Sequence, residues 1–196
     1  MTRLPSPRPP KVPLWRRGCA FAIDFAGAWL FSSLLAGNWF SWLVGFMLAW
    51  LGLRVVAANL NRGQSLGRWA LDMVVLEEDS NRIPLSIDLA KREAIAGLAA
   101  FFALLGLSSL DTKNAFYLLL VLPLVADLGL AWFESEEQQA FHDRVARTTI
   151  VGTRRGYSLD LKVKKWWRIA QKTWQQQAPE RFRGDRPPRR KRDDRY

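Results

Sequence analysis

The sequence has very little of the residues that build disulfide frameworks, metal centres and nucleophilic active sites. Its 196 residues include one cysteine, Cys19, and one histidine, His142. A single cysteine excludes an internal disulfide, and one His and one Cys without an acidic cluster around them do not make a metal-ligand set. No serine stands in the setting of a Ser–His–Asp nucleophile. We therefore expect a protein that is not an enzyme and that binds no metal or cofactor.

Charge is scarce in the first three quarters of the chain and abundant in the last. Residues 1–153 contain 14 Lys+Arg and 13 Asp+Glu, a net charge of +1, whereas residues 154–196 contain 15 and 5, a net charge of +10. We divide the chain accordingly into a Pro-rich disordered start (1–13), an apolar body (14–153), a basic helical segment (154–178) and a polar disordered tail (179–196).

Long apolar runs fill the body. A helix needs roughly 20 mostly apolar residues to cross a bilayer. The first run is too long for a signal peptide, contains Asp24 and is followed by no small-residue cleavage site. Four runs meet or approach the required length, at about residues 18–36, 39–58, 94–110 and 114–133. The fold class that we predict is an all-α membrane protein with four transmembrane helices, the last kinked at Pro123.

Basic residues indicate the orientation of these spans. They lie before the first span, between the second and third, and after the fourth, whereas the two opposite turns contain only Lys113. Cytoplasmic loops carry an excess of Lys and Arg, so four spans place both termini in the cytoplasm. The loop over residues 59–93 should then hold a short helical turn capped by Ser65, a strand over 72–76, and the start of a helix capped by Ser86.

Two carboxylates lie within apolar runs, Asp24 in the first and Asp127 in the fourth. An aspartate at the centre of a span costs on the order of 3 kcal/mol, so Asp24 needs a partner or a function. Arg17 precedes it by seven positions, close to two helical turns, and projects from nearly the same face. Two interpretations stay open: Arg17 holds Asp24 and the pair orders the helices, or Asp24 binds a proton or a cation. Asp127 lies near the cytoplasmic end of its span, where it can meet water, and Arg54 can extend its head group to the interface.

Three short motifs follow one another along the body. They are RGCAFAID, with Arg17, Ala20 and Asp24; GQSLGR, with Gly63, Ser65, Gly67 and Arg68; and HDRVARTTIV, with His142, Asp143, Arg144 and Thr148. Together they resemble the motifs of the RDD family of bacterial membrane proteins, over roughly residues 15–152. Arg68 stands where lysine is usual, and the stretch before the last motif is acidic where the family is often basic. GQSLGR lacks the spacing of a phosphate-binding Walker loop.

The resemblance implies a multi-pass protein of the bacterial cytoplasmic (inner) membrane. Most family members have no assigned activity, and a few resemble monovalent-cation/proton antiporters. Two functions therefore stay open for this chain: a small transporter of that kind, expected to be oligomeric, and a non-catalytic membrane scaffold that recruits a protein partner through its cytoplasmic loop and basic tail.

We expect the three motifs to meet in one polar cluster at the cytoplasmic face, with Asp143 and Arg144 against Arg68 or Arg17. The members of this expected cluster are Arg17, Asp24, Gly63, Ser65, Gly67, Arg68, Asp127, His142, Asp143, Arg144 and Thr148.

The segment after the body combines a helical apolar stripe with basic and tryptophan residues. Such a helix is typical of peptides that lie on a membrane surface, and it should bind anionic lipid headgroups. A basic chain end can also hold nucleic acid, which we regard as the less favoured partner. The residues expected at the membrane surface are Lys162, Lys165, Trp166, Trp167, Arg168, Lys172 and Trp174.

Overall fold

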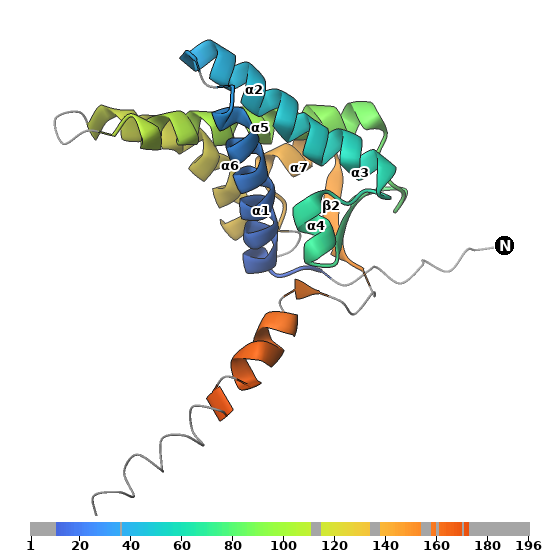
Figure 1. Cartoon of the computed structure of the whole chain (residues 1–196). Helices are drawn as coiled ribbons and strands as arrows, with labels where there is room; N and C mark the ends of the chain where they lie inside the picture. The colour runs from blue at the N-terminus through green and yellow to red at the C-terminus, as the bar shows by residue number, and fades with distance from the viewer. Residues whose placement is uncertain are drawn as a thin grey trace, which may run out of the picture. The chain divides into compact units, whose positions relative to one another are not determined.

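Helices make up most of the body of the chain (Figure 1). The computed structural model describes residues 11–35, 37–110, 115–133, 138–153, 158–159, 161–169 and 171–172. It divides into two units, Met1–Gly156 and Tyr157–Tyr196, and each is described here by itself. Of the start expected to be disordered (1–13), residues 1–10 lie outside the described residues, as do the tail at 179–196 and Trp174. Lys11 forms an antiparallel bridge with Val151, and Val12 is buried.

The first two helices pack against each other. α1 covers Leu14–Ser33, and α2 covers Trp39–Leu51. Asn38 starts α2 with a capping box, because its side chain accepts from the Ser41 N–H while the Ser41 hydroxyl accepts from the Asn38 N–H. The helix then continues through one π-helical turn, η1 (Gly52–Val56), into α3 (Ala57–Leu60). This π turn holds Arg54 and is where the helix departs from regular geometry.

The loop between α3 and the next long helix contains α4 (Leu66–Ala70) and strand β1 (Met73–Glu77). Ser65 caps α4, since its hydroxyl accepts from the Arg68 N–H at 3.4 Å. Ser86 does not act as the expected cap. It is the first residue of α5 (Ser86–Ser108), and its hydroxyl accepts from the Asn59 side chain instead.

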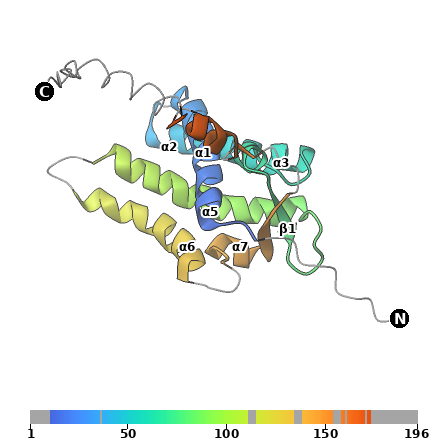
Figure 2. The same ribbon diagram turned by 90° about the horizontal axis from the view of Figure 1, so that it is seen from below.

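The second half of the body returns along α5. η2 (Ala115–Val121) is a 3₁₀ helix that continues as α6 (Leu122–Phe133), and Pro123, which has no N–H, stands where the geometry changes. Figure 2 shows α6 running beside α5, with α7 (Phe141–Val145) at one end of the pair. Strand β2 (Thr148–Gly152) then pairs antiparallel with β1, from Met73↔Gly152 to Glu77↔Thr148.

Two apolar clusters hold these elements together. One joins α1, η1 and α5 to the sheet through Ala20, Val55, Met73, Leu89 and Ile150. The other is aromatic and lies between α1, α2 and α5, where the rings of Phe46 and Trp50 stack and Phe101 packs against Phe46. The charged residues described below lie where these two clusters meet.

Two helices of the described residues are long and apolar enough to cross a membrane, Trp39–Leu60 and Ala115–Phe133. They correspond to the second and fourth predicted spans. α1 and α5 hold the first and third predicted spans and carry charged residues near their starts. These are Arg16 and Arg17 in the first turn of α1, and Asp88, Lys91, Arg92 and Glu93 in the first two turns of α5.

Candidate functional site

Asp24 is buried in α1, and its carboxylate is held by the loop between α3 and α5. The Ser65 hydroxyl donates to Oδ2 at 2.6 Å and the Gly67 N–H donates to Oδ1 at 2.7 Å. Arg54 Nη1 lies 3.4 Å from Oδ2. The expected pair with Arg17 is therefore wrong: the contacts of Asp24 come from the second motif and from Arg54.

The second motif has the residues that this contact requires. Gly63 has a φ of +83°, a left-handed conformation that favours glycine. Gly67 lies against the backbone of α1, so that a Cβ on it would stand 2.1 Å from the carbonyl oxygen of Ala20. Only glycine lets α4 approach α1 closely enough for the Gly67 N–H and the Ser65 hydroxyl to reach Asp24.

Arg54 is buried, not extended to an interface as expected. The π turn η1 directs its side chain into the protein, where the guanidinium lies 4.6 Å from the Trp50 ring centroid and 5.4 Å from that of Phe21. Its Nε donates to Glu93 Oε2 at 2.6 Å. Arg54 therefore links the α1 carboxylate to a second buried carboxylate on α5.

The Glu93 carboxylate accepts hydrogen bonds from three arginines. Besides Arg54, Arg68 donates to its Oε1, and Arg92 Nη1 donates to the same oxygen at 2.7 Å. Trp50 fixes the backbone at this point, because its indole N–H donates to the Glu93 carbonyl at 2.9 Å. Burial lowers the pKa of Arg68 to about 10 despite the attraction of Glu93, so this side chain is charged at neutral pH.

The third motif is connected to Glu93 through Asp143 and Arg92. Arg92 donates to Asp143 Oδ1 from both Nε, at 2.7 Å, and Nη2. Burial raises the pKa of Asp143, but the Arg92 charge and hydrogen bonds outweigh it, and the net shift is downward from the ordinary value. The expected contact of Asp143 with Arg68 or Arg17 is thus replaced by one with Arg92. Thr148, also buried, donates from Oγ1 to the Asp143 carbonyl at 3.4 Å.

His142 forms a second link, to α6. Its backbone N–H donates to Asp127 Oδ1 at 2.9 Å, and its ring Nδ1 lies 2.6 Å from Asp127 Oδ2. An ionised carboxylate only accepts, so with Asp127 ionised Nδ1 is the donor in this contact. Nε2 lies 3.5 Å from both Asp143 Oδ1 and Arg92 Nη2. Asp127 is only 4% exposed, although its carboxylate borders the groove between α5 and α6 described below.

These contacts connect eight side chains in one buried network, which we call the ion cluster. Its members are Asp24, Arg54, Arg68, Arg92, Glu93, Asp127, His142 and Asp143. Three guanidinium groups face four carboxylates, which leaves one negative charge when His142 is neutral and none when it is protonated. Among the described residues, no group of three or more His, Cys, Asp and Glu side chains is arranged to hold a metal ion.

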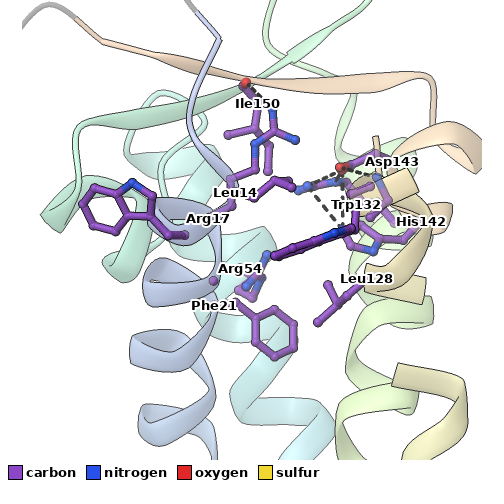
Figure 3. Close-up of a pocket in the computed structure, with 14 residues that line it drawn as sticks. Leu14, Arg17, Phe21, Arg54, Leu128, Trp132, His142, Asp143 and Ile150 are labelled. Atoms are coloured by element: carbon purple, nitrogen blue, oxygen red, sulfur yellow. Dashed lines mark hydrogen bonds and ion pairs between the residues drawn. The ribbon is translucent and has the colours of Figure 1, made fainter. Parts of the chain in front are cut away.

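Two charged members of the expected cluster, Arg17 and Arg144, lie outside the ion cluster. Arg17 donates from Nη1 to the Gln138 carbonyl at 2.6 Å. It also donates from Nη2 to the Ile150 carbonyl at 3.2 Å, which ties α1 to the third motif (Figure 3). Arg144 is exposed. Arg54, Arg92 and Glu93 complete the network instead.

Two cavities flank the His142–Asp127 pair. The first, of about 250 Å³, is lined by three arginines, His142, Asp143 and apolar residues that come mostly from α1 and α6 (Figure 3); the arginines are Arg17, Arg54 and Arg92. The second is a more open groove of about 480 Å³ between α5 and α6, lined by Asp127 among apolar side chains such as Phe102. The histidine therefore borders one cavity and its carboxylate partner borders the other.

In the second unit, residues 159, 161–169 and 171–172 are helical. Leu159, Val163, Trp166 and Trp167 line an exposed groove beside Lys162. The assignment of this helix to a membrane surface stays a prediction.

The body is mostly helical, two of its described helices are long and apolar enough to cross a bilayer, and buried ion pairs join its three sequence motifs. The family model of the RDD family matches residues 11–147, and the chain belongs to that family. The comparison with curated proteins gave no match, and neither did the comparison with solved structures.

Proposed function

We propose that the chain is a four-span protein of the bacterial inner membrane with both termini in the cytoplasm. The charges of α5 are confined to its first two turns, up to Glu93, and leave an uncharged segment from Ala94 to Ser108. In α1 the residues after Gly18 contain one charge, Asp24, which the ion cluster neutralises. Both helices can therefore cross the membrane alongside α2 and α6. A reporter fused after Tyr196 should read as cytoplasmic; a periplasmic signal would overturn this topology.

Within this frame we infer a proton-coupled transporter of the monovalent-cation/proton type, in which His142 and Asp127 carry the proton. The observation that supports it is the position of this pair between two cavities. A proton taken up at His142 Nε2, with release of the Nδ1 proton to Asp127, moves one charge from the first cavity towards the second. The imidazole is neutral before and after this exchange.

The charge of the ion cluster is consistent with such an exchange. A buried cluster with one unbalanced negative charge is costly, and either a proton on His142 or a monovalent cation nearby removes the imbalance. Binding of one would thereby disfavour binding of the other, which is the requirement for antiport. Asp24, by contrast, already has two hydrogen bonds and an arginine, and we assign it a structural function.

Proteoliposomes with an internal pH indicator test this proposal. A sodium or potassium gradient should drive proton movement through the wild type, and His142→Gln and Asp127→Asn should each abolish it. Asp88→Asn is the matched control, because Asp88 pairs with Lys91 at the surface. Absence of wild-type flux would exclude transport, and flux that survives both substitutions would show that the proton site is elsewhere.

A membrane scaffold is the second candidate, and the many hydrogen bonds and ion pairs within the cluster favour it. Ion pairs that fix the cytoplasmic loop and the third motif to the helices would present one rigid cytoplasmic face to a protein partner. A second copy of the chain is another partner that we propose for either function. The basic helix would add contact with anionic headgroups, for which nucleic acid is the less favoured alternative. Binding of the full chain to anionic vesicles that does not weaken with salt would argue against this use of the tail.

A further inference from the structure

The first cavity has an unpaired arginine in its wall. Arg17 is half-buried, and its two terminal nitrogens donate to carbonyl oxygens, which are neutral acceptors. Its Nε is buried and has no hydrogen-bond partner. No carboxylate of the described residues lies within 4 Å of this guanidinium; the nearest charge that acts on it is Asp143, which already pairs with Arg92, so Arg17 can still attract an anion in the cavity.

Besides Arg17, the wall contains Arg54, Arg92, His142 and Asp143; its other lining residues are mostly apolar and reach the surface. Figure 3 shows Phe21 and Leu128 facing the space below Arg17, with Trp132 beside them. Leu128 is 40% exposed and Trp132 is 78% exposed, so the apolar wall continues from the cavity to the outside of α6. α6 belongs to a helix able to cross a membrane, and this outer face would then contact acyl chains.

We propose that this cavity binds one anionic phospholipid, with the phosphate at Arg17 and the start of one acyl chain against Phe21, Leu128 and Trp132. Basic pockets between membrane helices recognise anionic headgroups in this manner. The volume of about 250 Å³ accommodates a phosphate and glycerol and the first part of a chain, and the remainder would run along α6. An inorganic anion alone would leave the apolar wall unused, and a neutral lipid would leave Arg17 unpaired.

Two glycine substitutions distinguish lipid binding in this cavity from lipid binding elsewhere on the protein. A Cβ on Gly18, which lines the cavity, or on Gly129, which does not, meets no atom within 4 Å. Gly18→Leu should therefore fill the cavity without disturbing the helix, and Gly129→Leu is the matched control. Arg17→Gln removes the charge, Arg17→Lys keeps it, and Arg82→Gln removes an exposed arginine of the loop as a control.

Native mass spectrometry of the delipidated full-length chain in neutral detergent counts the bound lipids. With phosphatidylglycerol, we expect the wild type to retain one more lipid than Gly18→Leu, while Gly129→Leu retains the wild-type number. Arg17→Gln should weaken this lipid about tenfold or more, with partial recovery in Arg17→Lys and no change in Arg82→Gln. Lipids bound by the tail are present in every variant, so a difference of one bound lipid between the wild type and Gly18→Leu measures binding in the cavity.

Several results would overturn the proposal. If phosphatidylcholine were retained equally, the site would not distinguish an anionic from a zwitterionic lipid. If Gly18→Leu and Gly129→Leu bound equal numbers of lipids, the lipid would lie outside this cavity. Full displacement by inorganic phosphate would indicate a headgroup site without a chain, and equal binding of oleate would indicate a fatty-acid site. If Arg17→Gln does not fold, the comparison of Gly18→Leu with Gly129→Leu decides. The measurement is independent of transport and of the orientation in the membrane.

Discussion

Gly67→Ala is the substitution for which the structure gives the sharpest expectation. The new Cβ would lie 2.1 Å from the Ala20 carbonyl oxygen and 2.8 Å from the Ala20 carbonyl carbon. Both atoms belong to the backbone of α1, which cannot turn aside as a side chain can. α4 must therefore move away from α1, and it carries with it the Gly67 N–H and the Ser65 hydroxyl that hold Asp24.

The magnitude follows from two costs, the overpacking and the loss of one hydrogen bond to Asp24. Overpacking against a fixed backbone costs about 1–3 kcal/mol. Loss of a hydrogen bond to a buried carboxylate costs about 1.5–3 kcal/mol more. We expect Gly67→Ala to lower the free energy of unfolding by about 2.5–6 kcal/mol, the sum of these ranges.

Reversible unfolding in mixed micelles, followed by tryptophan fluorescence, measures this change. Gly18→Ala is the control, since a Cβ on Gly18 meets open space and alanine favours the helix by about 0.5–1 kcal/mol. A Gly67→Ala protein within about 0.5 kcal/mol of the wild type would refute the close approach of α4 to α1.

Three further predictions concern the ion cluster and the aromatic core. Glu93→Gln leaves the guanidinium groups of Arg54 and Arg68 without their shared carboxylate, and should cost about 3–5 kcal/mol in the same assay; a loss below about 1 kcal/mol would contradict the network. The pKa of Asp143 is lowered on folding, so its contribution is complete above the ordinary value of 3.8 and is lost as the pH falls through the lower folded value. The wild type should therefore lose stability below about pH 4 more steeply than Asp143→Asn, and parallel curves would refute this assignment. Gly97→Ala places a Cβ 2.6 Å from the Trp50 ring and should shift tryptophan emission and lower stability by about 1–3 kcal/mol, whereas an unchanged spectrum and stability would show that Trp50 is not confined there.

The sequence motifs identified most of the residues around Asp24 but assigned the wrong partner. Arg17 was paired with Asp24 because helical periodicity compares positions only within one helix. The actual partners, Ser65 and Gly67, come from a loop about 40 residues away, and their approach depends on a glycine that only the packed structure explains.

Arg54, Arg92 and Glu93 could not be assigned to the site from their local sequence. Arg54 stands near the end of an apolar run, where an arginine ordinarily extends to the interface, and the π turn that directs it inward has no reliable sequence signal. Arg92 and Glu93 lie in a charged stretch that resembles a solvated helix start. One available signal was the run of small residues after Glu93, including Ala96 and Gly97, which is typical of a helix packed closely on its neighbours.

The residues of the ion cluster are translated in an order that determines when the cluster can form. Asp24, Arg54, Arg68, Arg92 and Glu93 leave the ribosome first, and together they carry one excess positive charge. Asp143 follows Arg92 by 51 residues, an interval of about 3–10 s at ordinary rates of translation. During that interval Arg92 lacks the carboxylate that it will bind, and the last strand of the sheet does not yet exist. The earlier helices can therefore insert before the ion cluster and the sheet are complete. Both are completed only when the third motif, with Asp143 and β2, has been translated.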